Sequence, residues 1–113
     1  MKEKLSKEVN QTVTNFTLAY PELKGSVEAF KKYEKRYGKI DERREAEYLL
    51  RLRHIQLIEE SFRRVVKPDD QKQVWAYFFK KKKPEAWEKK MLDEAVEKWM
   101  YTIAQELGLT REF

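Results

Sequence analysis

Cysteine is absent from this 113-residue chain, and glycine and proline occur only three times each. Without cysteine the chain has no disulfide, no thiolate nucleophile and no sulfur-ligated metal. Its isolated glycines cannot form a glycine-rich phosphate loop. No stretch approaches the ~20 apolar residues of a membrane span, and the start lacks the apolar core of a signal peptide. These absences predict a cytoplasmic protein with no membrane partner.

Charged residues of both signs are unusually frequent in the chain. Charged residues make up 40% of it, compared with about 25% in an ordinary soluble domain. Because 25 basic and 20 acidic residues are mixed and 41% of the chain is hydrophobic, we expect an ionic surface around a packed core and not a disordered polyelectrolyte. The length suits one domain, residues 1–113.

Apolar side chains recur every three or four positions between the glycines and prolines, and no run alternates with a period of two. This spacing is typical of amphipathic helices and argues against strands. The sequence therefore predicts an all-α, single-domain bundle of four to five helices. The expected helices cover residues 5–20, 27–37, 42–66, 71–79 and 85–107.

Turn-forming and capping residues set the expected boundaries. Pro21 is expected to end the first helix and Ser26 to cap the second. Asp41 can cap the third, which at ~1.5 Å per residue would be close to 40 Å long and central to the bundle. Gly108 followed by apolar Leu109 fits a Schellman ending of the last helix.

Aromatic residues are expected mainly in the core, because most lie at helical spacing. In the last helix one stripe is predicted to face inward, made of Trp87, Met91, Ala95, Trp99, Ile103 and Leu107. Tyr77, Met100 and Tyr101 fall off the stripes and are predicted to be exposed, where they could anchor a protein partner or stack on unpaired bases.

The basic excess lies before Pro84. Residues 1–83 contain 21 basic and 13 acidic side chains, whereas residues 84–113 contain 4 and 7. A polyanion is therefore expected to avoid the last helix. The run Lys80–Lys83 has a structural interpretation, since lysines at a helix C-terminus face the negative end of its dipole and the residue before a proline leaves helical geometry.

The other interpretation of the lysine run is a phosphate-binding cluster, extended by further basic residues and one tyrosine. Its candidate residues for nucleic-acid or partner binding are Lys80, Lys81, Lys82, Lys83, Lys89, Lys90, Lys31, Lys32, Lys35, Arg36 and Tyr77. The sequence leaves both interpretations open.

From about Arg53 onward two stretches stand out: VKPDDQKQVWAYFFKKK, which follows a long helix, and TIAQELGLTREF, which looks like the first helix and turn of a helix-turn-helix. In these stretches the chain resembles the region-4-like domain of sigma factors and the phage late-transcription regulators of the ArpU and RinA type. It implies action on DNA or the transcription machinery. The second stretch is also compatible with a single helix from Glu85 to Leu107 that ends at Gly108.

Catalytic chemistry is not indicated. His54 is the only histidine, with no nucleophile or metal ligand at a suitable spacing, and paired carboxylates such as Glu59 and Glu60 point in different directions on a helix. We expect no enzyme activity, no metal site and no cofactor. Two functions remain: a small phage-type or bacterial regulator that binds nucleic acid, and an adaptor or inhibitor that docks on a protein by a charged and aromatic helix face, with a homodimer also open.

Overall fold

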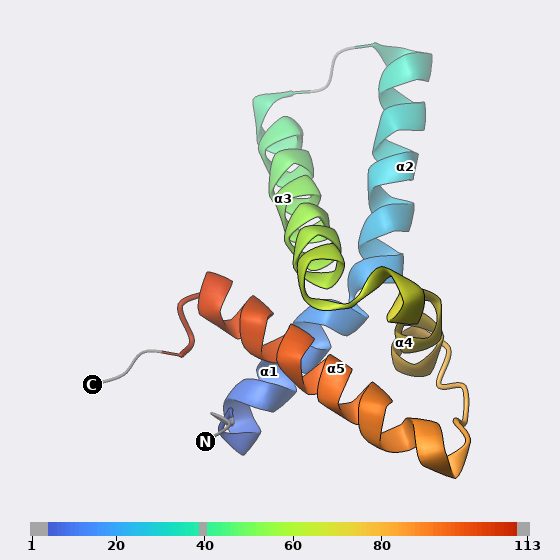
Figure 1. The fold of residues 1–113 in the computed structure, drawn as a ribbon. Coiled ribbons are helices and arrows are strands. Elements are labelled where there is room, and N and C mark those ends of the chain that lie inside the picture. Colours follow the sequence, from blue (N-terminus) through green and yellow to red (C-terminus); the bar gives the residue numbers. More distant parts are fainter. Residues whose placement is uncertain (1–4, 39–40, 111–113) are drawn as a thin grey trace.

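The computed structural model describes residues 5–38 and 41–110, and within these ranges it contains only helices and their connections (Figure 1). This confirms the predicted all-α bundle. The elements are α1 (Lys7–Leu18), α2 (Tyr20–Tyr37), α3 (Glu42–Val65), the short 3-10 turn η1 (Pro68–Asp70), α4 (Gln71–Phe79) and α5 (Ala86–Glu106).

The first two helices form one bent rod. The N–H of Ala19 donates to the carbonyl of Asn15 at 3.2 Å, and the N–H of Leu23 donates to the carbonyl of Ala19 at 3.0 Å, so helical hydrogen bonding continues through the bend. The prediction that Pro21 ends a helix is wrong, because this residue lies in the first turn of α2, where a missing N–H costs nothing. The predicted cap, Ser26, is also wrong: it lies inside α2.

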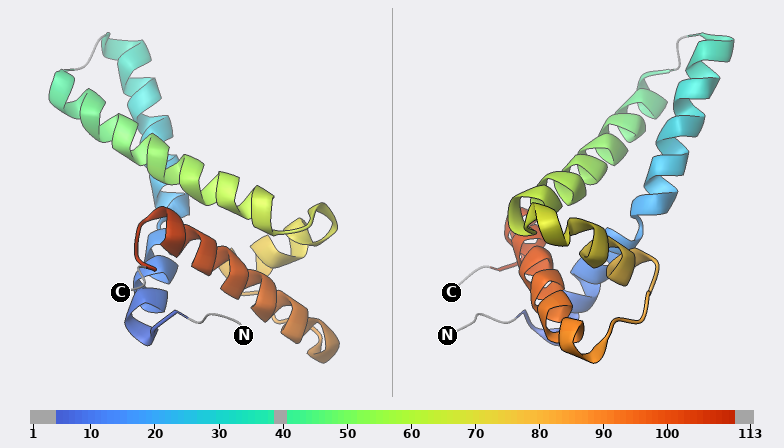
Figure 2. Two further views of the ribbon diagram at one scale, coloured as in Figure 1. Left: turned by 60° about the vertical axis from the view of Figure 1, so that its left-hand side comes forward. Right: turned by 45° about the vertical axis from the view of Figure 1, so that its right-hand side comes forward.

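The long third helix is confirmed. The Asp41 carboxylate accepts a hydrogen bond from the N–H of Arg44 at 3.0 Å and so caps α3 as predicted. Helix α3 runs antiparallel to α2, and together they make a hairpin that projects from the rest of the molecule (Figures 1 and 2). The molecule is accordingly elongated, with extents of 51 × 38 × 22 Å.

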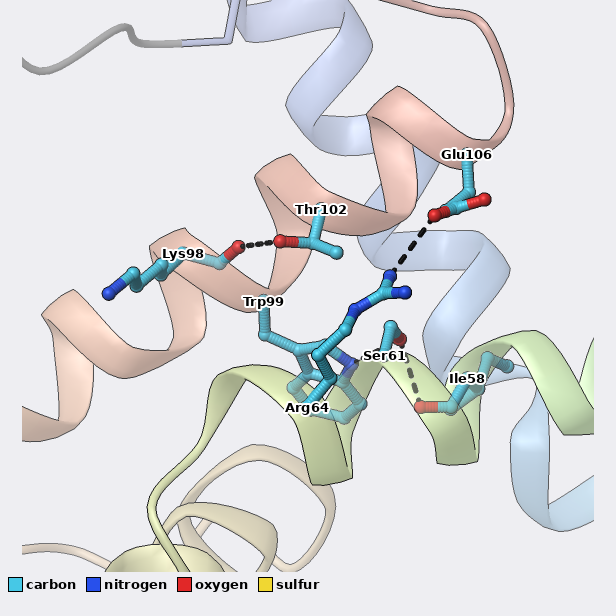
Figure 3. Close-up of polar contacts among 7 residues, drawn as sticks. All are labelled: Ile58, Ser61, Arg64, Lys98, Trp99, Thr102 and Glu106. Carbon is cyan, nitrogen blue, oxygen red and sulfur yellow. Dashed lines mark hydrogen bonds and ion pairs between the residues drawn. The ribbon is translucent and has the colours of Figure 1, made fainter.

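Helix α5 is buried on two neighbouring faces because it packs against both α3 and α1. Trp99 faces α3, where its indole N–H donates to the hydroxyl of Ser61 at 3.0 Å (Figure 3). Met100 faces α1, and its sulfur lies 3.6 Å from the hydroxyl of Thr17. The prediction that Met100 is exposed is therefore wrong. A helix held between two others buries more than one stripe.

Helix α4 adds aromatic rings to this core. Trp75 packs edge-on against Phe62 and Tyr20, each at 5.1 Å between ring centroids, and Phe79 lies 4.3 Å from Trp75. Phe62 in turn contacts Trp99 at 4.8 Å. Such edge-to-face contacts stabilise a core beyond the burial of area alone. The expected core role of these aromatics is confirmed.

The two ends of α5 differ. At its C-terminal end the N–H of Leu109 donates to the carbonyl of Ala104 at 2.8 Å and that of Gly108 to Gln105 at 3.0 Å, which is the predicted Schellman motif. At its N-terminal end Trp87 is 79% exposed. The prediction that Trp87 lies in the core is wrong, because the first turn of α5 extends past the helices that cover its middle (Figure 1).

Candidate nucleic-acid interface

The lysine run turns the chain sharply out of α4. The backbone N–H groups of Lys80 and Lys82 both donate to the carbonyl of Ala76, at 3.0 and 3.3 Å. Between them Lys81 has a φ of 51°, in the left-handed region that side chains other than glycine rarely adopt. The run thus satisfies a free carbonyl at the end of α4 through its backbone.

A hollow of about 600 Å³ lies beside this turn. Three lysines line it: Lys72 comes from the first turn of α4, and Lys80 and Lys82 from the residues after its end. Phe62 and Trp75 line the apolar side of the hollow. The same helix therefore supplies positive charge at both of its ends to one concave surface.

The charge of this hollow, which we call the lysine hollow, has one sign. None of the described residues that line it carries a carboxylate; its remaining members are Gln71 and Ala76. The side chains of Lys72, Lys80 and Lys82 are exposed and so stay hydrated and mobile. Such an arrangement attracts an anion that can meet several ammonium groups together, as a chain of phosphates does.

Two of the predicted binding residues, Lys89 and Tyr77, form hydrogen bonds to a carboxylate of the protein itself. Lys89 donates to Asp93 at 2.9 Å, and the hydroxyl of Tyr77 donates to the other oxygen of the same carboxylate. These bonds, that of Tyr77 first, lower the pKa of Asp93, while the bond to Asp93 raises the pKa of Tyr77. Tyr77 is also half-buried and not exposed as predicted. The network ties α4 to α5.

The predicted basic cluster is divided between two places. Lys31, Lys32, Lys35 and Arg36 lie exposed on the outer half of α2, in the projecting hairpin, whereas Lys80–Lys83 lie at the link between α4 and α5. Figure 1 shows these segments at separate ends of the molecule. The structure therefore offers two basic surfaces and not one continuous patch. Exposed Lys90 belongs with the second.

Lys72 was missed at the level of sequence. The signal was present, since Lys72, Ala76 and Lys80 are spaced four apart and share one face of a helix. The small side chain of Ala76 leaves room between the two lysines. The turn that brings Lys82 to the same surface depends on the left-handed backbone of Lys81. No pattern in the sequence predicts this conformation.

A second hollow, of about 690 Å³, lies along α5. Its apolar wall includes Val65, Val66, Met91 and Ala95. The charged residues around it are of both signs: Lys67, Lys98, Asp70, Glu94 and Glu97. This mixture gives a polyanion no advantage there, so the lysine hollow is the better candidate.

His54 has a packing role. Its ring stacks on Phe16 with 3.4 Å between centroids, and its Nε2–H donates to the Phe16 carbonyl at 2.9 Å. Burial lowers the pKa of His54, against the smaller opposite effect of this hydrogen bond. In the described part of the chain, no three histidine, aspartate or glutamate side chains gather where they could hold a metal ion. None of the helices placed there combines the length and apolar character needed to span a bilayer.

Comparison with protein-family models, with curated proteins and with solved structures gives no match. Any functional proposal therefore rests on the sequence and the geometry of the chain itself.

Proposed function

We propose that this chain is a small, non-enzymatic regulatory protein that acts by binding nucleic acid through the lysine hollow. The observation that carries the proposal is the convergence of Lys72, Lys80 and Lys82, from the first turn of α4 and from the turn that follows this helix, on one surface without a carboxylate. Phosphate contacts of this kind supply most of the affinity of non-specific nucleic-acid binding. The sequence resemblance to phage transcription regulators points in the same direction.

The structural role of the lysine run does not explain why it consists of lysines. The turn needs backbone N–H groups and a left-handed residue, and glycine would meet the second need better than Lys81 does. The helix dipole favours a cation at the C-terminal end of α4, which accounts for Lys80 alone. The remaining ammonium groups are thus available for binding.

A salt titration tests the proposal. Binding of a generic duplex should weaken as salt rises, with a slope of log affinity against log salt of about −0.9 for each phosphate neutralised. In the triple variant Lys72→Gln, Lys80→Gln, Lys82→Gln, we expect this slope to become less negative by about 2 to 3. Because the three side chains are exposed, each substitution should change the free energy of unfolding by no more than about 0.5 kcal/mol.

The chain offers a matched control on α2. The triple variant Lys31→Gln, Lys32→Gln, Lys35→Gln removes the same charge from the hairpin. It should bind nearly as well as the unchanged protein. An equal loss in both variants would mean that net charge and not the lysine hollow drives binding. Absence of binding even at low salt would end the proposal.

A second candidate function is self-association through the hairpin tip, defined as residues 28–37 of α2 and residues 41–50, which are the N-cap and the first turns of α3. Its apolar side chains are unusually exposed: Tyr33 by 44%, Tyr37 by 65%, Leu49 by 51% and Leu50 by 65%. Exposed aromatic and aliphatic groups of this kind mark protein interfaces.

Charge favours a second copy of the chain as the partner. Residues 28–37 carry four basic and two acidic side chains, and residues 41–50 carry two basic and four acidic ones. A two-fold pairing can therefore place α2 of one copy against α3 of the other. Sedimentation velocity should show a dimer, and the double variant Leu49→Ser, Leu50→Ser a monomer. Leu18→Ser, at an exposed site on α1, should leave the dimer intact; a monomeric unchanged protein would exclude the idea.

A further inference from the structure

Trp87 is the most exposed of the large apolar side chains in the described part of the chain, at 79%. An indole ring left in water loses the favourable burial that makes tryptophan a core residue. The backbone that carries the ring belongs to the first turn of α5 and not to a loop. An uncovered aromatic face on a helix is suited to receive another flat group.

The surroundings of Trp87 are positive. Residues 80–90 contain six lysines and two glutamates, Glu85 and Glu88. Lys89 is held by Asp93, but Lys83 and Lys90 are exposed. The other carboxylates of α5 begin at Asp93, one turn and a half further along. The acidic character of the last helix therefore does not reach its first turn, and the expected avoidance of this helix by a polyanion does not apply there.

We propose that Trp87 stacks on an unpaired base, so that the nucleic acid bound by this protein is single-stranded. The inference rests on the proposed function of the lysine hollow and names its ligand. In a duplex the faces of the bases are covered by their neighbours, and a side chain on a helix surface cannot reach them. In a single strand a base can leave the stack and lie on the indole, whatever its sequence, because every base has a π-face.

The lysine hollow and Trp87 are close enough along the chain to act on one strand. Trp87 lies five positions after Lys82, which at about 3.3–3.6 Å per residue limits their Cα separation to less than about 18 Å. Lys83 and Lys90 lie on either side of Trp87 in sequence. The strand backbone then meets lysines while a base meets the ring, which is the usual combination in proteins that bind single strands.

A lipid surface is the main competing ligand, because tryptophan and lysine also occur together at membrane interfaces. The structure favours nucleic acid. One turn along α5 from Trp87 lie exposed Lys90 and half-buried Met91, so the first turn presents a single exposed large apolar side chain beside a lysine and not the broad apolar face that inserts into a bilayer. The lysine hollow is concave, so it can enclose a single nucleic-acid strand more closely than it can contact a flat bilayer.

The test measures fluorescence anisotropy with a labelled oligothymidylate of about 12 nucleotides, a length within the range that one such site covers, and with a duplex of equal length. We expect the single strand to bind more tightly. Trp87→Ala should weaken its binding by about 10- to 100-fold and leave duplex binding unchanged, while Trp87→Phe should retain most of the affinity. Leu18→Ala, which removes another exposed apolar side chain, from α1, should have no effect.

Each other outcome has a definite meaning. If Trp87→Ala binds the single strand as well as the unchanged protein while the triple lysine-to-glutamine variant does not, the stacking inference is wrong and the proposed function survives. If the unchanged protein binds neither oligonucleotide, both fail. If Trp87→Ala instead reduces binding to vesicles of anionic phospholipid and not to oligothymidylate, the ligand is a membrane and the inference is overturned.

Discussion

The indole N–H of Trp99 donates to the hydroxyl of Ser61 at 3.0 Å, and both side chains are completely buried (Figure 3). The Ser61 hydroxyl in turn donates a hydrogen bond to the carbonyl of Ile58 at 3.0 Å. This pair fixes the depth of α5 against α3. We predict that Ser61→Ala lowers the free energy of unfolding by about 1–3 kcal/mol, because the buried indole N–H loses its acceptor. Urea denaturation measures the change.

Thr102 provides the control for that variant. Its hydroxyl donates to the carbonyl of Lys98 at 2.9 Å on an exposed face of α5 (Figure 3). Thr102→Ala removes a hydroxyl of the same kind where water can replace it, so the expected change stays within about 0.5 kcal/mol. Equal effects of the two substitutions would contradict the role given to Ser61.

Two glycines should respond to alanine in opposite directions. Gly25 lies inside α2, where a Cβ would meet no atom within 4 Å, so Gly25→Ala should stabilise the protein by about 0.5–1 kcal/mol. Gly108 has a φ of +73° in the Schellman turn, so Gly108→Ala should destabilise it by about 1 kcal/mol. Thermal midpoints compare the two variants. A shift of both in the same direction would refute the turn geometry.

Lys81 has a backbone conformation that glycine adopts more readily than lysine does. Its φ of 51° is unfavourable for a residue with a Cβ, so Lys81→Gly should raise the free energy of unfolding by about 0.5–1 kcal/mol. Lys82, which lacks this conformation, is the control: Lys82→Gly should be neutral or destabilising. Chemical denaturation decides between them. A destabilised Lys81→Gly protein would mean that the turn does not exist in solution.

Acid should weaken the packing of His54. Burial lowers the pKa of this residue in the folded protein below its ordinary value of 6.5. The neutral ring is present in both states above that pH, and the full stability is then observed. As the pH falls below 6.5 the unfolded chain takes up a proton before the folded one does, so stability is lost towards the lower folded pKa. Urea midpoints between pH 7.5 and 5.5 should fall for the unchanged protein and stay flatter for His54→Gln.

Local signals in the sequence were sufficient where one residue decides the structure. Asp41 caps α3 and Gly108 closes α5 as predicted, because capping needs only a suitable side chain or a permissive backbone at a helix end. Pro21 failed as a signal since the same ring that ends a helix is also tolerated in a first turn. The bent rod of α1 and α2 could not be predicted from that residue alone.

Burial in α5 was harder to predict because it depends on the neighbouring helices. A periodic stripe gives the direction of one buried face, but it does not say that α1 covers Met100 or that no helix covers Trp87. The lysine hollow shows the same limit. The spacing of Lys72 and Lys80 on one helix face was visible in the sequence, whereas the turn after α4 that brings Lys82 to the same surface was not.

The hairpin of α2 and α3 extends beyond the reach of α1, α4 and α5 (Figure 2). In its outer half, α2 and α3 pack only against each other. Phe30 of α2 stacks there on Tyr48 of α3. Amide protons there should exchange with solvent deuterons far sooner than those around Trp99, since opening this arm leaves the remaining structure closed. We therefore expect the outer half of the hairpin to open more readily than the rest of the molecule. A partner that binds there must also restrict this motion.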